Sequence, residues 1–288
     1  MLGIIGGSGA YDLLAGLGLG RRGPVPTPFG ESAALYDWEL GGQPAVFLSR
    51  HGERGYSICA PWVNYRANIW ALKDAGVTAI LAWSGPGAIA PDLQPGQYVL
   101  PDDLLDETRG REDSFYRGTG LGFVRQHPVF CPRLRRAAAQ ALGELGAVWR
   151  DGGTYACTQG PRLETPAEIR KLGLLGAHLV GMTLAPECFL ARELEMCYLP
   201  VCYVTNLAEG VQPAEYREGE LFEGLLGPEQ AKLVQEAMGR FPAMMEATAR
   251  ALAPGDCPCQ HAMERYRRRG QIGADWREWV AGGGAGSP

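Results

Sequence analysis

Three short segments of the chain carry polar side chains that suit a small heterocycle and an anion. The first ends in Glu164, the second contains Met182 and Thr183, and the third contains Asn206, each beyond an apolar stretch. A carboxylate accepts hydrogen bonds, a carboxamide donates and accepts, and a hydroxyl does either. This combination fits one polar ring bound beside one anion.

Glu164 and Asn206 are the pair that would discriminate between purines. A 6-oxopurine offers N1–H as a donor and O6 and N7 as acceptors, so Glu164 can accept from N1–H while the Asn206 amide donates to O6 or N7. Adenine reverses this pattern at C6, and a buried mismatch costs about 1–3 kcal/mol. For either residue taken alone, a helix cap or a turn is an equal alternative.

Donors for an anion occur at two other expected strand ends. Gly6-Gly7-Ser8-Gly9 can point backbone N–H groups and the Ser8 hydroxyl into one concavity. In Ser49-Arg50-His51-Gly52, Arg50 can form paired bonds to phosphate oxygens and His51 can add a donor. A plain glycine turn and a structural Arg–His pair are the alternatives. Together with Thr183, however, donors at three strand ends converge naturally in an open α/β sheet.

The segment Ser84-Gly85-Pro86-Gly87 also follows a buried strand, and its small residues would let a ligand approach the backbone. The alternative is a strand-to-loop turn. A dinucleotide-binding fingerprint fits poorly, because Asp12 occupies the third glycine position after Gly7-Ser8-Gly9. The glycines and prolines of residues 23–30 also forbid a regular crossover helix.

Strand-like and helix-like segments alternate along the chain, which predicts an α/β fold with a largely parallel sheet. We expect one domain over residues 1–253 and a C-terminal extension over 254–288 that is partly flexible, with 282–287 disordered. The expected strands are 4–5, 45–48, 77–82, 154–157, 179–182 and 198–205, and the expected helices are 63–75, 132–145, 166–174, 186–194 and 228–251.

Composition excludes several classes of protein. The net charge of −5 over 288 residues gives no basic footprint for nucleic acid, and the basic run at 265–269 is more typical of a solvated or intersubunit face. No uninterrupted apolar run is long enough to predict a membrane span, and the N-terminus reads as a first strand rather than a signal peptide.

The eight cysteines are mostly scattered singly in apolar context, as expected for buried free thiols of a cytosolic protein. Only Cys257-Pro258-Cys259 is clustered, and with His261 it supplies three soft ligands without an evident fourth. A redox-sensitive pair or a plain tail is therefore favoured, and we expect no metal.

From Met1 to about Ala253 the chain resembles the trimeric purine nucleoside phosphorylase / methylthioadenosine phosphorylase family. The resemblance implies a single-domain nucleoside phosphorylase fold with a central mixed β-sheet flanked by helices. It rests on Ile4-Ile5-Gly6-Gly7-Ser8-Gly9, Ser49-Arg50-His51-Gly52, the segment 63–72, Gly160-Pro161-Arg162, Gly181-Met182-Thr183 and Pro186-Glu187. The segment 64–70 and the tail at 257–259 are most similar to the methylthioadenosine branch.

The resemblance implies a phosphorolysis, in which phosphate attacks the anomeric carbon of a purine nucleoside and the base leaves. Asn206 would be the catalytic residue, because it stabilises the negative charge on the departing purine. The other implied contacts are phosphate with Ser8, Arg50, His51, Ser84, Gly85 and Thr183, and substrate with Leu163, Glu164, Met182, Asn206 and Ala208. Inorganic phosphate is a co-substrate, no metal or organic cofactor is implied, and a cytoplasmic homotrimer, or a hexamer, is expected.

Departures from the family pattern set the expected specificity. Adenine-specific members place aspartates where this chain has Asn206 and Ala208, and they lack Glu164. We therefore expect phosphorolysis of inosine, guanosine or methylthioinosine, giving ribose 1-phosphate or its 5-methylthio analogue. A methylthioadenosine phosphorylase that tolerates Asn206 remains one alternative. Another is a non-catalytic purine-binding protein, because Gly55 replaces a second histidine and Pro86 stiffens its loop.

The side of the pocket that would face the ribose 5′ position is not assigned by the sequence. Residues 210–226 should cover it but do not align with the family. A neighbouring subunit is expected to contribute there, and His127 is either that contribution or a surface histidine.

Overall fold

The computed structural model describes residues 1–7, 9–14, 16, 18–53, 56–212, 219, 221 and 226–281. Its largest sheet has eight strands in the order β11-β9-β14-β7-β1-β6-β5-β2. Their bounds are β1 Leu2–Gly6, β2 Gly20–Gly23, β5 Leu35–Leu40, β6 Gln43–Ser49, β7 Ala79–Ser84, β9 Tyr98–Leu100, β11 Trp149–Asp151 and β14 Cys197–Tyr203.

The four central strands, β14, β7, β1 and β6, are mutually parallel, whereas β9, β5 and β2 join the sheet through antiparallel pairings. Every residue of β1, β7 and β14 is buried, as expected for apolar parallel strands that are covered on both faces. Because these strands run the same way, their carboxyl ends meet at one edge of the sheet. The expected mixed α/β fold is confirmed, and the parallel part is its centre.

A second, five-stranded sheet was not predicted from the sequence. Its order is β10-β12-β13-β8-β15, with bounds β8 Gly87–Ala88, β10 Asp103–Glu107, β12 Thr154–Thr158, β13 Ala177–Gly181 and β15 Asn206–Leu207. A short hairpin of β3 Pro26–Thr27 and β4 Gly30–Glu31 completes the strands of the described residues. The strands β8 and β15 have only two residues each, which is too short to show an alternating pattern, so they could not be predicted from the sequence.

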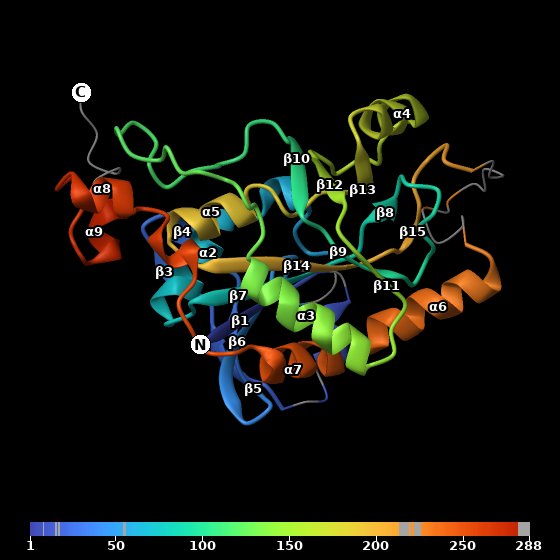
Figure 1. Cartoon of the computed structure of the whole chain (residues 1–288), viewed down its shortest axis with the longest axis horizontal. Helices are drawn as coiled ribbons and strands as arrows, with labels where there is room; N and C mark the ends of the chain where they lie inside the picture. The colour runs from blue at the N-terminus through green and yellow to red at the C-terminus, as the bar shows by residue number, and fades with distance from the viewer. Residues whose placement is uncertain are drawn as a thin grey trace.

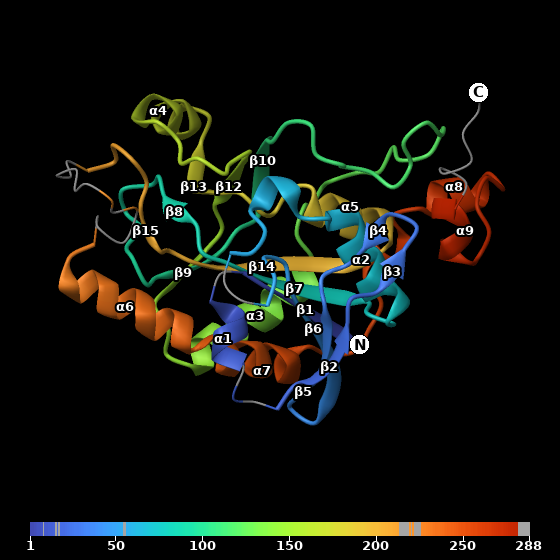
Figure 2. The ribbon, with the colours of Figure 1, turned by 180° about the vertical axis from the view of Figure 1, so that it is seen from behind.

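Helices cover both faces of the large sheet. Figures 1 and 2 both place α2 Tyr65–Asp74 and α5 Glu187–Glu193 on one side of β14, and α3 Pro132–Glu144 and α7 Phe241–Ala251 on the other. Helix α4 Pro166–Leu174 lies beside β13, and α6 Pro228–Gly239 extends toward β15. Two shorter helical segments are α1 Ala10–Leu14 and the 3-10 turn η2 Ala60–Trp62.

The prediction of one long helix over 228–251 is wrong, because the segment forms two helices that meet at Arg240. Pro242 lies in the first turn of α7. A proline there has no N–H to donate, and its ring would collide with the carbonyl four residues earlier if the helix continued. The predicted helix at 63–75 begins at Tyr65, since the Asn64 side chain caps it by accepting from Ala67 N.

The described part of the C-terminal extension is folded. It forms the 3-10 turn η4 Pro258–His261, α8 Glu264–Arg268 and α9 Trp276–Ala281, at the end of the molecule opposite α4 and α6 (Figures 1 and 2). Trp279 and Val280 are buried in the main core. The expected disorder at 282–287 falls outside the described residues. No helix in the described part of the chain is long and apolar enough to cross a bilayer.

Candidate functional site

One cavity of about 730 Å³ opens where the carboxyl ends of both sheets meet. Such a position is the usual ligand site of an open α/β sheet. The predicted residues that line it are Arg50, His51, Ser84, Gly85, Leu163, Glu164, Met182, Thr183, Asn206 and Ala208. Ser8 and Gly55 lie outside the described residues, but Gly7 and Gly9 line the cavity. The proposed anion and purine contacts thus face one space, and the role of each residue remains a prediction.

Arg50 and Glu187 form a fully buried ion pair at the floor of this cavity. Arg50 Nε donates to Glu187 Oε2 at 2.9 Å and Arg50 Nη2 donates to Oε1 at 2.7 Å. Arg50 Nη1 donates to the Trp83 carbonyl at 3.0 Å, and the Tyr198 hydroxyl donates to Glu187 Oε1 at 2.6 Å. Burial opposes the positive charge, but the Glu187 carboxylate keeps the pKa of Arg50 above its usual value. The pair therefore joins the ends of β6 and β7 to α5 and β14.

The paired bond that we expected Arg50 to give phosphate is made to Glu187. Three of its five N–H groups are used by Glu187 and Trp83, which leaves one on each terminal nitrogen for a ligand. Gly7 lies directly over this guanidinium, because a Cβ at Gly7 would be 2.8 Å from the Trp83 oxygen and 3.4 Å from Arg50 Nη1. Only glycine lets the backbone approach so closely. Contact of Arg50 with phosphate remains a prediction.

His51 is buried beside Arg50 and is neutral near pH 7. Burial, and then the charge of Arg50, lower the pKa of His51 to about 4. Its Nδ1 lies 2.9 Å from the Ile58 carbonyl, which can only accept, so Nδ1 carries the proton and Nε2 has the lone pair. Neutral His51 therefore has an acceptor at Nε2 rather than the second donor that we expected, and its contact with phosphate remains a prediction.

Tyr155 connects the two hydroxyl groups on the anion side of the cavity. Its hydroxyl lies 3.3 Å from Ser84 Oγ. Burial raises the pKa of Tyr155 well above its usual value, and hydrogen bonds with Ser84 and Thr183 oppose this only in part. Gly181 makes room for the ring, since a Cβ there would lie 1.9 Å from the Tyr155 oxygen. Tyr155 was not predicted, because within a buried strand an inward tyrosine looks like any core aromatic.

Glu164 is positioned by the two elements on either side of it. The Thr158 hydroxyl, at the end of β12, donates to Glu164 Oε1. On the other side, Thr165 and Glu168 form a reciprocal capping box at the start of α4. One Glu164 oxygen is thus occupied, and the half-buried carboxylate keeps accepting capacity for a ligand donor in the cavity.

The Asn206 amide has a defined orientation. Its Oδ1 accepts from the Thr205 hydroxyl at 2.7 Å, and its Nδ2 donates to the Leu207 carbonyl at 2.8 Å. These partners set which end is the donor and leave one Nδ2 hydrogen for a ligand. The backbone is fixed as well, because Asn206 pairs with Gly87 between β15 and β8. Thr205 N also donates to the Pro86 carbonyl at 3.0 Å, so the loop at Pro86 supports the segment that carries Asn206.

Arg111 is a positioning residue that the sequence did not reveal. Its buried guanidinium donates to the carbonyls of Met182 at 2.8 Å and Ala185 at 2.6 Å. It also donates to the carbonyls of Thr158 at 3.1 Å and Gln159 at 2.8 Å. It thereby ties together the two loops that carry Glu164 and Thr183. An isolated arginine in a polar stretch gives no pattern from which this could be inferred.

His127 is exposed and is not among the residues that line the cavity. Within this chain it therefore has no part in the site. The two roles considered for His127, a surface histidine or a contribution to the site of a neighbouring subunit, both remain predictions.

The fold and the cavity define a phosphorylase-type α/β protein, and comparison with known proteins identifies its family. Residues 2–239 match the model of the Phosphorylase superfamily. The chain therefore belongs to this superfamily, and the resemblance found in its sequence is confirmed.

Relatives are similar to this chain over most of their length. The "6-oxopurine nucleoside phosphorylase" of Pyrococcus furiosus is 40% identical over 246 residues, covering 83% of this chain and 91% of the relative. The "Probable S-methyl-5'-thioinosine phosphorylase" of Methanothermobacter thermautotrophicus is 40% identical over 264 residues, covering 91% and 89%. Among solved structures, a mutant adenosine/methylthioadenosine phosphorylase from Schistosoma mansoni in complex with adenine has a TM-score of 0.79 at 29% identity, covering 93% of this chain and 97% of that one.

Substitution of Glu187 tests whether the part of the cavity beside Arg50, where we expect an anion to bind, depends on the buried ion pair. Glu187→Gln leaves the Arg50 charge uncompensated, so we expect unfolding to need about 3 kcal/mol less free energy in phosphate-free buffer. Added phosphate should stabilise this variant more than wild type, because it supplies the missing negative charge. Urea denaturation with and without phosphate measures both effects. Glu193→Gln, a buried carboxylate bonded to Ser114 instead, is the matched control. An equal phosphate effect on wild type and Glu187→Gln would contradict the assignment.

The lowered pKa of His51 predicts a loss of stability in acid. Its folded pKa of about 4 lies below its ordinary 6.5. The unfolded chain therefore takes up the proton first, and stability present above pH 6.5 is lost as pH falls toward 4. Across this interval we expect the free energy of unfolding of His51→Gln to fall by about 3 kcal/mol less than that of wild type. Parallel denaturation curves at pH 7 and pH 4 measure the difference, and identical losses would show that His51 is not held neutral.

Proposed function

We propose that the protein catalyses phosphorolysis of purine nucleosides, with a preference for 6-oxopurine bases such as those of inosine, guanosine or methylthioinosine. The products are the free base and ribose 1-phosphate or its 5-methylthio analogue. The observation that carries the proposal is the single cavity lined both by anion donors and by Glu164 and Asn206. The named relatives, which include 6-oxopurine nucleoside and methylthioinosine phosphorylases, support it.

The anion end of the cavity would hold inorganic phosphate against the sugar. The backbone at Gly7 and Gly9 and the hydroxyls of Ser84 and Thr183 surround this end, and the remaining Arg50 N–H groups lie beneath it. A phosphate oxygen then forms a bond to the anomeric carbon as the bond from that carbon to purine N9 breaks. Holding the two reactants in one cavity supplies the proximity that the reaction needs.

The purine end would stabilise the leaving group. The electron pair of the broken bond enters the purine, where negative charge grows on N7 and O6. The free Nδ2 hydrogen of Asn206 is oriented in advance by Thr205 and Leu207, so it can donate to this charge without rearranging. Glu164 accepts from N1–H of a 6-oxopurine, whereas adenine presents a lone pair at N1 and would face the carboxylate unfavourably.

Helix α6 gives the cavity an apolar wall. Ala231, Val234 and Met238 line it from that helix, with the polar Gln235 beside them. A Cβ at Gly9 would lie 3.1 Å from Met238 Sδ. This wall therefore adjoins the glycines of the anion end.

A substrate panel and one substitution test the proposed specificity. We expect inosine or methylthioinosine to exceed methylthioadenosine in kcat/KM when phosphate is present. Asn206→Asp should shift that ratio toward methylthioadenosine by about 10–100-fold, because an acceptor replaces the amide donor. Asn206→Ala is the control and should slow both substrates without a comparable shift. An unchanged ratio in Asn206→Asp would rule out this reading of the purine end, and base binding without any turnover would favour a non-catalytic purine-binding protein.

We further propose that the protein works as a homotrimer in the cytoplasm, as the family resemblance implies. Exposed aromatic and apolar side chains near the cavity support an assembly: Tyr56 lines its mouth and is 60% exposed, and Trp62 is 66% exposed. Light scattering should give three times the 31.0 kDa chain mass, or six times for a hexamer. A monomer at working concentration would contradict the assembly, and Trp62→Asp should weaken it.

A further inference from the structure

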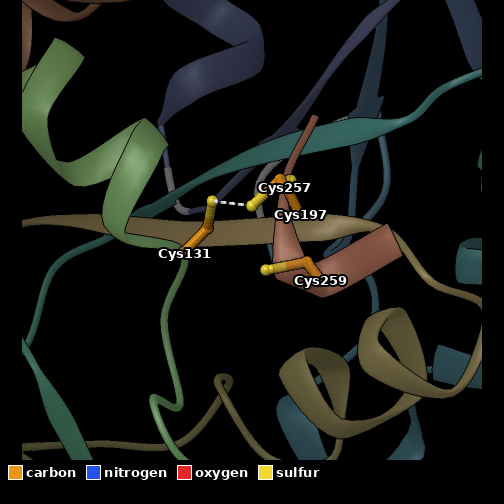
Figure 3. Close-up of side chains that lie close together, drawn as sticks. All are labelled: Cys131, Cys197, Cys257 and Cys259. Atoms are coloured by element: carbon orange, nitrogen blue, oxygen red, sulfur yellow. Dashed lines mark hydrogen bonds between the residues drawn. The ribbon is translucent and has the colours of Figure 1, made fainter. Parts of the chain in front are cut away.

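Four cysteines gather at the opposite end of β14 from the cavity. The sulfur atoms of Cys131, Cys197, Cys257 and Cys259 all lie within 4.8 Å of one another, and all four residues are buried. Figure 3 shows these side chains turned toward a common centre, with the Sγ atoms of Cys131 and Cys257 3.5 Å apart. The cluster shares no residue with the cavity described above.

Three separate segments bring these cysteines together. Cys131 precedes α3, and its N–H donates to the Tyr198 carbonyl of β14 at 2.9 Å. Cys197 begins β14, and Cys257 and Cys259 lie on either side of the first residue of η4. His261, the third soft ligand that the sequence suggested, is instead exposed and lies 3.0 Å from Asp256.

The arrangement of sulfur atoms suits a tetrahedral metal ion. A zinc ion bound to four thiolates has Zn–S distances of about 2.3 Å, which puts neighbouring sulfur atoms about 3.8 Å apart. The 3.5 Å between Cys131 and Cys257 and the 4.8 Å limit for all four sulfur atoms lie on either side of that value. Four protein ligands leave no open position, as in a structural rather than a catalytic zinc site.

Two arginines beside the cluster supply the charge that such a centre requires. Zinc with four thiolates carries a net charge of −2. Arg133 Nη2 lies 3.8 Å from Cys197 Sγ, and Arg192 Nη1 lies 3.6 Å from Cys259 Sγ, so two positive charges face two of the sulfur atoms. Arg133 Nε is buried without a hydrogen-bond partner in the described part of the chain. Disulfides are neutral, and among the described residues they would leave these guanidinium groups with neutral carbonyl acceptors but no ion pair.

We propose that Cys131, Cys197, Cys257 and Cys259 bind one structural zinc ion. Cys197 begins β14, and Tyr203, which lines the cavity, ends the strand six residue steps, or about 20 Å, further on. None of the four cysteines lines the cavity. The ion therefore takes no part in the reaction. It joins the C-terminal extension to α3 and β14, where Arg133 also donates to the carbonyls of Ala253 and Gly255.

Metal content and thiol count of the purified full chain test the proposal together. We expect one zinc and no iron per chain by plasma mass spectrometry, and eight free thiols after unfolding in chelator without reductant. X-ray absorption at the zinc edge should show four sulfur neighbours near 2.3 Å. A chain without zinc would overturn the proposal, whether its thiols are free or paired in disulfides, and so would iron in place of zinc.

Single substitutions locate the ion. Cys257→Ser and Cys259→Ser should each lower zinc content at least tenfold and lower the melting temperature, because one of four ligands is lost. Cys188→Ser, a buried thiol of α5 outside the cluster, is the matched control and should keep one zinc per chain. Zinc retained in both cluster variants, or lost from the control alone, would overturn the assignment. Wild-type metal content decides the question even if a variant fails to fold.

Discussion

The buried pair of Arg50 and Glu187 is the interaction on which the site depends. Both side chains are removed from water, so removing either one leaves the other as a destabilising, uncompensated buried charge. Because Arg50 also bonds to Trp83 and Glu187 accepts from Tyr198, the pair joins the carboxyl ends of β6 and β7 to the start of α5 and to the amino-terminal part of β14. The fold places this charge where an anion would bind, while the carboxylate prevents an isolated buried cation when no ligand is present.

The groups that line the cavity fall into two sets, one expected to bind the anion and the other the purine. Glycine backbone, hydroxyls and the remaining N–H groups of Arg50 belong to the anion end, and Glu164 with Asn206 belongs to the purine end. Arg111 connects them, because its guanidinium holds the carbonyls of the loops that carry Thr183 and Glu164. The proposed zinc centre lies outside this arrangement and stabilises the opposite end of β14.

Sequence alone predicted the parts of the fold that repeat locally and the polar residues at strand ends. The apolar strands β1, β7 and β14 and the residues after them were found because parallel strands place their carboxyl ends together. The second sheet was missed because β8 and β15 have only two residues each. Arg111, Tyr155 and the convergence of Cys131 with Cys257 were missed because they depend on contacts between distant segments. The break at Arg240 was readable from Pro242 but was not predicted.

The most direct test of the central claim is a crystal structure with hypoxanthine and phosphate bound together. The account predicts phosphate between the Gly7–Gly9 backbone, Ser84 and Thr183, above the Arg50–Glu187 pair. It also predicts hypoxanthine with N1–H donated to Glu164 and with the Asn206 amide donating to N7 or O6. Density for the base far from Asn206, or for the anion outside the cavity floor, would contradict it.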